Sequence, residues 1–350
     1  MNPKILLGFE IGTGEAQYIE PSHLIVTGIS SRSGKTTTLE ALAERSGAKL
    51  LIFSTKPGEK IFTNARTIPS YYSSRSDWKY VESLLEALLR ERMKYDRYWI
   101  IESCRGTKTL KEVDQNISKY LSQAKPDSYR FQAYTLLHTY FEDVLPALNQ
   151  IHFTSEFPKL EIGSNLMDLT EMPVEVQSLV IQSCLEHVLK HEENIITVIP
   201  ELWKFAPQGR GNPVKRELES LIRQGAVKHN FVWMDSQDLS GVDKLPLKQV
   251  FHWVMGLQTE SNEVQHTIDQ IPLPSKERPK TDEIMSLKKG QFILASPGLV
   301  KHVYVCPIWL AELEAQKVAR GEQITEEDWS DVYDVAEQAL RQITMSEIIV

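Results

Sequence analysis

The sequence predicts an α/β fold in which a mostly parallel β-sheet is flanked by helices on both faces. Short apolar runs typical of strands alternate with helical patterns through much of the chain. One such run, residues 23–27, leads through a glycine- and serine-rich loop directly into a helix. With 350 residues, 41% of them hydrophobic, the chain is long enough for one large α/β domain or two smaller ones.

The loop reads GISSRSGKTTT over residues 28–38, and this pattern predicts a phosphate-binding loop. Small residues let consecutive backbone N–H groups converge on phosphate oxygens, and the following helix N-terminus adds partial positive charge. Lys35 would reach the β- and γ-phosphates of ATP, and the Thr36 hydroxyl would ligate Mg²⁺. The residues expected to bind the nucleotide are Gly28, Ser31, Arg32, Ser33, Gly34, Lys35, Thr36 and Thr37.

The loop departs by one residue from the usual G-x-x-x-x-G-K-[ST] spacing. That spacing would put the first glycine at position 29, where the chain has Ile29, so Gly28 stands one residue early. The alternative interpretation is a serine-rich turn that binds no nucleotide. The strand before the loop and the helix after it favour the nucleotide site.

The alternation also predicts the next elements in chain order. The strand before the loop spans residues 24–28, its helix residues 36–45 and the next strand residues 49–54. The pattern then becomes almost wholly helical, and we expect residues 76–150 to form an inserted helical subdomain. Residues 1–75 and 151–308 would be the two parts of the α/β domain, the first with the phosphate-binding loop.

After the insertion the sheet is expected to resume. Strands are predicted at residues 160–169, 195–199, 231–234 and 250–256, with a late hairpin at 291–295 and 301–306. Helices are predicted at residues 173–189, 213–228 and 262–271. Residues 309–350 have the pattern of an acidic, helical C-terminal tail.

Charge is distributed unevenly along the chain, whose net charge is −8. Residues 309–350 contain ten acidic and three basic residues, so most of the negative excess lies in the tail. Residues 204–228 contain six basic and two acidic residues, which permits a local basic surface on an acidic chain. An ordinary solvated helix face fits this segment as well.

Other features exclude some classes of protein. The three cysteines lie far apart, which predicts free thiols and no disulfide framework or zinc site. No segment approaches the roughly 18 apolar residues of a membrane span, and the N-terminus does not resemble a secretory signal. We therefore expect a cytoplasmic protein that does not bind a membrane.

A nucleotide hydrolase also needs a carboxylate near the γ-phosphate, and the strand at residues 195–199 is followed by Glu201. At the carboxyl end of a parallel strand Glu201 would face the loop and act as general base, although a chance strand-end glutamate is the alternative. Pro200 stands where an aspartate that holds Mg²⁺ through water is expected, and Asp168 or Glu201 itself could compensate. If Glu201 is not the base, Asp168 and Asp235 are the next candidates. Gln237, after the strand at 231–234, would contact the γ-phosphate or orient the attacking water.

Taken in order, these segments resemble the HerA–FtsK superfamily of P-loop ATPases, and HerA-like ATP-binding proteins in particular. The matching segments are TGE at 13–15, His23, the loop, NLMDLT at 165–170, VIPE at 198–201, LIRQG at 221–225, DSQ at 235–237 and KGQFIL at 289–294. The resemblance implies a RecA-like sheet of order 5-1-4-3-2 and a hexameric ring that moves DNA. It also implies phosphate and metal roles for Lys35 and Thr36, a catalytic carboxylate at Glu201 and a sensor at Gln237.

Two departures from the family pattern leave alternatives open. The arginine-rich stretch of the family is only partly present, so the candidates for an arginine that acts on a neighbour's γ-phosphate are Arg210, Arg216 and Arg223, with Arg223 first because it lies in the matching segment. Pro200 and the longer loop permit a regulatory switch with slow turnover that acts through a protein partner. A DNA-packaging or conjugation motor, or a partnership with a nuclease, is equally compatible with the residues.

Overall fold

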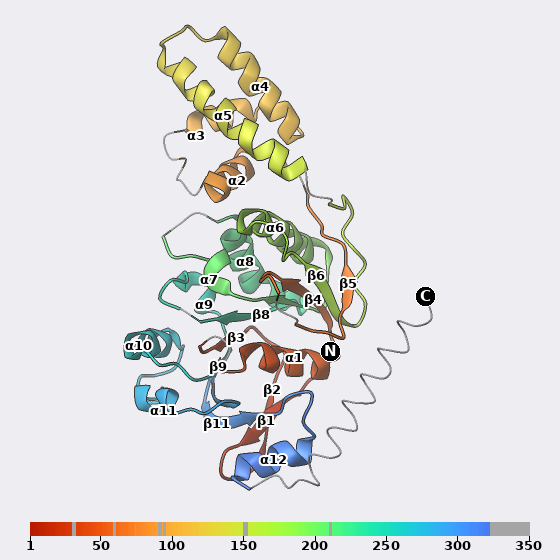
Figure 1. Cartoon of the computed structure of the whole chain (residues 1–350), viewed down its shortest axis with the longest axis vertical. Helices are drawn as coiled ribbons and strands as arrows, with labels where there is room; N and C mark the ends of the chain where they lie inside the picture. The colour runs from red at the N-terminus through yellow and green to blue at the C-terminus, as the bar shows by residue number, and fades with distance from the viewer. Residues whose placement is uncertain are drawn as a thin grey trace.

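The structure, a computed structural model, describes residues 1–29, 33–58, 61–73, 75–89, 93, 96–149, 153–209, 212–237 and 239–322. Within them, eleven strands form one mixed sheet with helices on both faces (Figure 1). The strands are β1 (Ile5–Glu10), β2 (Ala16–Ile19), β3 (Leu24–Thr27), β4 (Lys49–Ser54), β5 (Arg66–Ile68), β6 (Gly163–Asp168), β7 (Ile195–Ile199), β8 (Phe231–Ser236), β9 (His252–Met255), β10 (Gln291–Ser296) and β11 (Leu299–Val305). Their order in the sheet is β2-β1-β11-β10-β9-β3-β8-β7-β4-β6-β5.

The strands from β9 to β5 in this order are all parallel. When strands are counted from the one before the phosphate-binding loop, β3, β4, β7, β8 and β9 become strands 1 to 5. They lie in the order 5-1-4-3-2 that the resemblance implies, and β6 and β5 extend the sheet beyond β4. The carboxyl ends of β3, β4, β7 and β8 therefore share one edge of the sheet.

The other part of the sheet is antiparallel and was only half predicted. The late hairpin is present as β10 and β11, and β10 joins it to β9. The strands β1 and β2, which sequence analysis did not predict, pair with each other and with β11. Residues 5–9 lack charged side chains and show no alternation because this part of β1 is buried, and the partner β11 lies almost at the other end of the described chain.

Successive side chains of each strand point to opposite faces of the sheet. On one face α1 (Lys35–Ser46) packs in a cluster that includes Val26, Val198 and Trp233. On the other face α6 (Val174–His191) and α8 (Pro213–Gln224) pack in a cluster that includes Ile199 and Met234. These clusters fix which strand side chains can face α1 and the loop before it.

Four helices lie between β5 and β6 in the sequence and project from the sheet (Figure 1). They are α2 (Trp78–Leu89), α3 (Arg97–Ser103), α4 (Leu110–Gln123) and α5 (Tyr129–Asn149). They enclose a hydrophobic cluster of their own that includes Tyr134 and Phe141, and Leu179 of α6 joins it. Arg75, just before α2, pairs with Glu186 of α6 and ties this segment to the sheet domain.

The remaining helices are short. They are α7 (Leu202–Phe205), the 3-10 helix η1 (Gly225–Lys228), α9 (Lys244–Leu247), α10 (Ser261–Gln270), α11 (Thr281–Met285) and α12 (Glu312–Arg320). The single helix predicted at 213–228 instead changes to the 3-10 form at Gly225, where the chain turns back so closely that a Cβ would lie 2.7 Å from the Asn230 carbonyl oxygen.

The C-terminal helix α12 packs on β1 and β11 through a small cluster with Leu6, Phe9 and Ala315. Residues 323–350 of the predicted acidic tail lie outside the described residues. All three cysteines are free, as predicted. Among the described residues, no helix combines the length and the apolar character that crossing a membrane requires.

Candidate nucleotide-binding site

The loop between β3 and α1 has a backbone that its glycines make possible. Gly28 has a φ of 142°, and a Cβ at this position would lie only 2.6 Å from Ser33 Cβ. Gly34 has a φ of 86° immediately before α1. Ser31 and Arg32 lie outside the described residues, so their contacts with a nucleotide stay predictions.

Lys35 is folded back over this loop. Its Nζ donates to the carbonyl oxygen of Gly28 at 2.8 Å and to that of Ile29 at 3.3 Å, and the residue is buried. Ser33 Oγ donates to the same Ile29 carbonyl at 2.8 Å. A phosphate in the loop would offer the ammonium group a stronger, charge-assisted acceptor than these carbonyl oxygens. Lys35 therefore lies within reach of the phosphate that the loop is predicted to bind.

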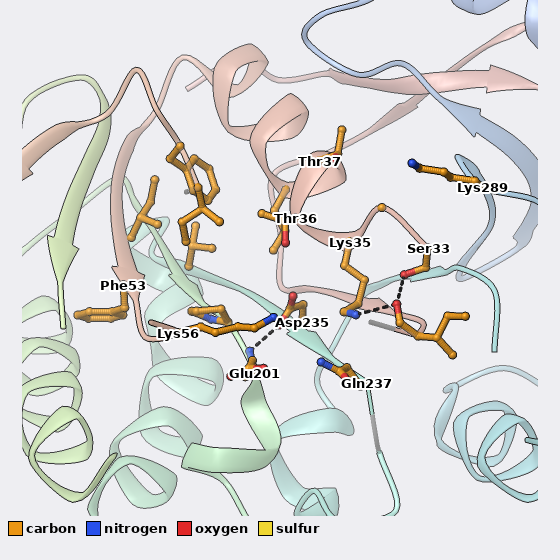
Figure 2. A pocket seen from close by; sticks show the side chains of 18 residues that line it. Ser33, Lys35, Thr36, Thr37, Phe53, Lys56, Glu201, Asp235, Gln237 and Lys289 are labelled. Atoms are coloured by element: carbon orange, nitrogen blue, oxygen red, sulfur yellow. Dashed lines mark hydrogen bonds between the residues drawn. The ribbon is translucent and has the colours of Figure 1, made fainter. Parts of the chain in front are cut away.

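A cavity of about 250 Å³ opens beside the loop at the carboxyl edge of the parallel strands (Figure 2). Glu201 and Gln237 line it from the ends of β7 and β8. Gly28 does not line the cavity, but its carbonyl oxygen accepts a hydrogen bond from Lys35, which does. The other predicted nucleotide-binding residues that line the cavity are Ser33, Gly34, Lys35, Thr36 and Thr37.

Glu201 follows β7 in a left-handed conformation, with φ 50° and ψ 52°, which residues other than glycine rarely adopt. Its backbone N–H donates to Asp235 Oδ1 at 2.5 Å, and this bond holds the turn. Its carboxylate pairs with Lys204 of α7, and the Glu201 side chain is only 12% exposed. Backbone strain of this kind clusters at functional sites, where the surrounding structure must maintain it.

Two further lysines line the cavity. Lys56, in the segment after β4, extends toward Asp235, whereas Lys289, in the turn before β10, lies beside the loop on the other side (Figure 2). Three lysines, Lys35, Lys56 and Lys289, thus line the cavity against two carboxylates, Glu201 and Asp235, and this excess of positive charge suits a polyphosphate.

The donor set in the cavity fits Mg²⁺. The Thr36 hydroxyl and the carboxylates of Glu201 and Asp235 are hard oxygen ligands of the kind that this ion prefers. No group of three His, Cys, Asp or Glu side chains that could hold a metal occurs in the part of the chain that the structure describes. Mg²⁺ carried by nucleotide phosphates needs only one or two protein carboxylates, so these residues suffice.

Arg223 does not line this cavity. It lies on α8, where its half-exposed side chain pairs with Glu219 at 2.9 Å. Asp168, the other strand-end carboxylate that the sequence suggested, is exposed at the end of β6 and accepts hydrogen bonds from Thr170. It does not line the cavity either.

Four of the basic residues at 204–228 have acidic partners, and two of these partners, Glu201 and Asp243, lie outside the segment. Ion pairs join Lys204 to Glu201, Lys215 to Asp243, Arg216 to Glu217 and Arg223 to Glu219. Arg210 lies outside the described residues. These four ion pairs offset part of the positive charge of the segment.

Two of the charged residues in the cavity, Lys56 and Lys289, have no role predicted from the sequence, and Asp235 was predicted only as an alternative base to Glu201. Lys289 was noted only as part of KGQFIL, and Lys56 was not considered. A signal existed for Lys56 and Asp235, because each stands at or just after the carboxyl end of a predicted parallel strand. Only the pairing of the strands shows that these ends meet at the loop.

A scan against protein-family models and a search of curated proteins gave no match. Among solved structures, VirB4 of Thermoanaerobacter pseudethanolicus is similar with a TM-score of 0.68 at 12% identity, over 90% of this chain and 98% of that one. The bacterial conjugative coupling protein TrwB is similar with a TM-score of 0.58 at 14% identity, over 85% of this chain and 88% of that one. TrwB in complex with ADP and Mg²⁺ has a TM-score of 0.57 at 13% identity, over 89% of this chain and 97% of that one.

At identities this low, the structural likeness is evidence of a shared fold alone. The likeness covers most of this chain and agrees with the 5-1-4-3-2 strand order and with the loop before α1. The chain has the RecA-like P-loop NTPase fold.

Proposed function

We propose that this chain is a P-loop ATPase of the HerA–FtsK superfamily that hydrolyses Mg-ATP. The observation that carries the proposal is the convergence of the loop, Glu201 and Gln237 in one cavity. These parts come from the ends of β3, β7 and β8, which are distant in the sequence but adjacent in the sheet. A serine-rich turn without a nucleotide would not need a glutamate and a glutamine at its own edge.

Each residue has a task that its position allows. The loop amides, the α1 N-terminus and Lys35 bind the β- and γ-phosphates. Glu201 accepts the proton of the attacking water, and Gln237 orients that water or donates to the γ-phosphate. Thr36 would hold Mg²⁺ that arrives with the phosphates, and the ion would neutralise part of the negative charge that develops during phosphoryl transfer.

We extend the proposal to a hexameric ring that couples hydrolysis to movement on double-stranded DNA in the cytoplasm. The sequence resemblance supports it, as does the shared fold with TrwB, which is described as a conjugative coupling protein. In such a ring the half-exposed Arg223 would act on the nucleotide of a neighbouring subunit. Among biological settings, the likeness to TrwB favours conjugation over packaging.

A specific observation favours a second candidate, a regulatory switch with slow turnover. Glu201 pairs with Lys204, and Pro200 offers no carboxylate beside it. If the ion pair with Lys204 prevents Glu201 from accepting a proton, hydrolysis would require a protein partner, such as a nuclease, that moves Lys204 away from Glu201.

Steady-state hydrolysis, with and without double-stranded DNA at about 50 mM salt, tests both candidates. Glu201→Gln keeps the size of the side chain but cannot accept a proton, so turnover should fall by about 10²-fold while ATP remains bound. The control is Glu277→Gln, in an exposed turn away from the cavity, which should hydrolyse ATP like the wild type. Undiminished turnover in Glu201→Gln would remove this residue as the base.

DNA separates the motor from the switch. The motor should be stimulated by DNA of any sequence, and the stimulation should weaken as salt rises because phosphate contacts release counterions. Joint replacement of Arg210 and Lys215 by glutamine should lower the stimulation and the salt slope; Lys204 is left intact because it contacts Glu201. Turnover that ignores DNA but responds to a protein partner would reject the motor and support the switch.

A further inference from the structure

The strand β7 lacks the carboxylate that Mg²⁺ is expected to need before the catalytic glutamate. It ends at Ile199, and the next residue is Pro200, whose ring has neither charge nor hydrogen-bonding atoms. The neighbouring strand β8 is parallel to β7, with Ile199 opposite Met234. One residue further along, Pro200 comes directly after the end of β7 and Asp235 is still within β8, so the two residues lie close together at this edge of the sheet.

The alternation of side chains decides which way Asp235 faces. Ile199 and Met234 lie in the cluster with α6 and α8, whereas Val198 and Trp233 lie in the cluster with α1. Asp235 is two residues beyond Trp233, so it faces the α1 side, as a side chain at position 200 would. Both Pro200 and Asp235 line the cavity, together with Thr36 at the start of α1.

Asp235 is buried, and its side chain is held in place at the cavity. Only 5% of the residue is exposed, and β8 pairs it with Val26 on the strand that leads into the loop. Its Oδ1 accepts the backbone N–H of Glu201 at 2.5 Å. A carboxylate has about four acceptor sites, and Asp235 lines the cavity together with Thr36, so it is placed to accept hydrogen bonds from water bound to a metal ion there.

We propose that Asp235 on β8 takes the part of the carboxylate missing at Pro200: it binds the water shell of Mg²⁺ in the Mg-nucleotide complex, and it positions Glu201 through the turn. The assignment rests on the proposed nucleotide site. It moves the metal-binding carboxylate to the adjacent strand, two residues before the predicted sensor Gln237.

The test is the affinity for a fluorescent ATP analogue, measured once with Mg²⁺ and once with EDTA. Asp235→Asn keeps an oxygen for the Glu201 N–H but loses the charge, so the gain in affinity due to Mg²⁺ should fall about tenfold or more. Affinity in EDTA should stay the same or improve, since a negative charge near the phosphates is removed. The matched control is Asp168→Asn, at the end of β6 and outside the cavity, whose Mg²⁺ gain should equal that of the wild type.

The outcomes separate this inference from the proposed function. A wild type that binds no nucleotide in either condition overturns both. A wild type that binds nucleotide without any Mg²⁺ gain, or an Asp235→Asn variant with the full gain, overturns the role of Asp235 and leaves the nucleotide site standing.

A second variant guards against a folding defect in Asp235→Asn. Asp235→Ser keeps a hydroxyl acceptor in less space and should lose the same Mg²⁺ gain. Adding Pro200→Asp to Asp235→Asn returns a carboxylate to the end of β7 and should recover part of the gain. No recovery in a folded double variant contradicts the idea that the two positions face one ion.

Mn²⁺ electron paramagnetic resonance with the nucleotide bound measures how much metal the wild type and each variant retain, independently of turnover.

Discussion

The cavity edge and the helical segment α2–α5 are built in opposite ways. The cavity draws its side chains from the ends of β3, β4, β7 and β8, which meet because parallel strands share a carboxyl edge. The helical segment is closed largely by neighbours in sequence, such as α4 on α5, around the buried Tyr134 and Phe141. Chemistry in this protein thus depends on long-range topology, whereas the helical segment depends on local packing.

The comparison predicts that substitutions should separate into two classes. Changes at the cavity should alter nucleotide binding with little effect on stability, and changes inside α2–α5 should do the reverse. The two regions are nevertheless linked through α6, because Leu179 joins the helical cluster and Glu186 pairs with Arg75. The strength of that link is open to measurement.

The largest expected effect is on the stability of the helical segment. Phe141→Ala removes a side chain that is 1% exposed, and the lost burial and the cavity left behind should cost about 3–5 kcal/mol in unfolding free energy. Urea unfolding followed by circular dichroism measures it, and the ATP-analogue affinity should stay within about threefold of wild type. Leu136→Ala, on the same helix but 40% exposed, is the control and should change stability by about 0.5 kcal/mol or less.

A weaker nucleotide affinity in folded Phe141→Ala would break the comparison, because it would show that α2–α5 and the cavity are coupled through α6.

The next effect belongs to the cavity. Lys35→Ala removes the ammonium group that, in the proposed site, binds the β- and γ-phosphates, and ATP-analogue affinity should fall about 100-fold, or about 2.7 kcal/mol. The unfolding midpoint should change little. Lys49→Ala, at the opposite end of β4, should bind like the wild type, and equal affinity in Lys35→Ala would take this lysine out of the site.

The smallest effect sharpens the comparison within the sheet itself. His23 is buried beside β8, where its Nδ1 accepts the Val232 N–H at 3.1 Å, and burial lowers its pKa to about 4. Because the pKa of His23 in the folded protein is below its ordinary value, protonation of His23 favours the unfolded protein. The free energy of unfolding is therefore undiminished above about pH 6.5 and falls as the pH drops toward 4. Between pH 7 and pH 5 the loss should be about 2 kcal/mol.

Urea unfolding of the wild type and of His23→Gln at both pH values checks this loss. The variant should depend less on pH, although His252, with its pKa also lowered to about 4 by burial, remains. Identical pH dependence in the two proteins would contradict the assignment to His23.

Much of the fold was predictable because its signals are local. Each strand of the parallel part except the short β5 was predicted within a few residues, since apolar runs bounded by turn residues reveal buried strands. The loop was recognisable from Gly28, Gly34 and Lys35 and from the strand and helix around it. The strands β1 and β2 escaped because their reason for being strands is a partner, β11, at the far end of the described chain.

The sequence by itself determined the phosphate-binding loop, the alternation of strands and helices, and the presence of a glutamate and a glutamine at strand ends. Tertiary structure alone decided that Asp235 stands beside Pro200, that Lys56 extends into the same cavity, and that Lys204 pairs with Glu201. The physical reason is the range of the interactions. Backbone preference and side-chain periodicity act over a few residues and can therefore be recognised in the local sequence. The residue that lies beside a strand end depends instead on the order and register of the whole sheet.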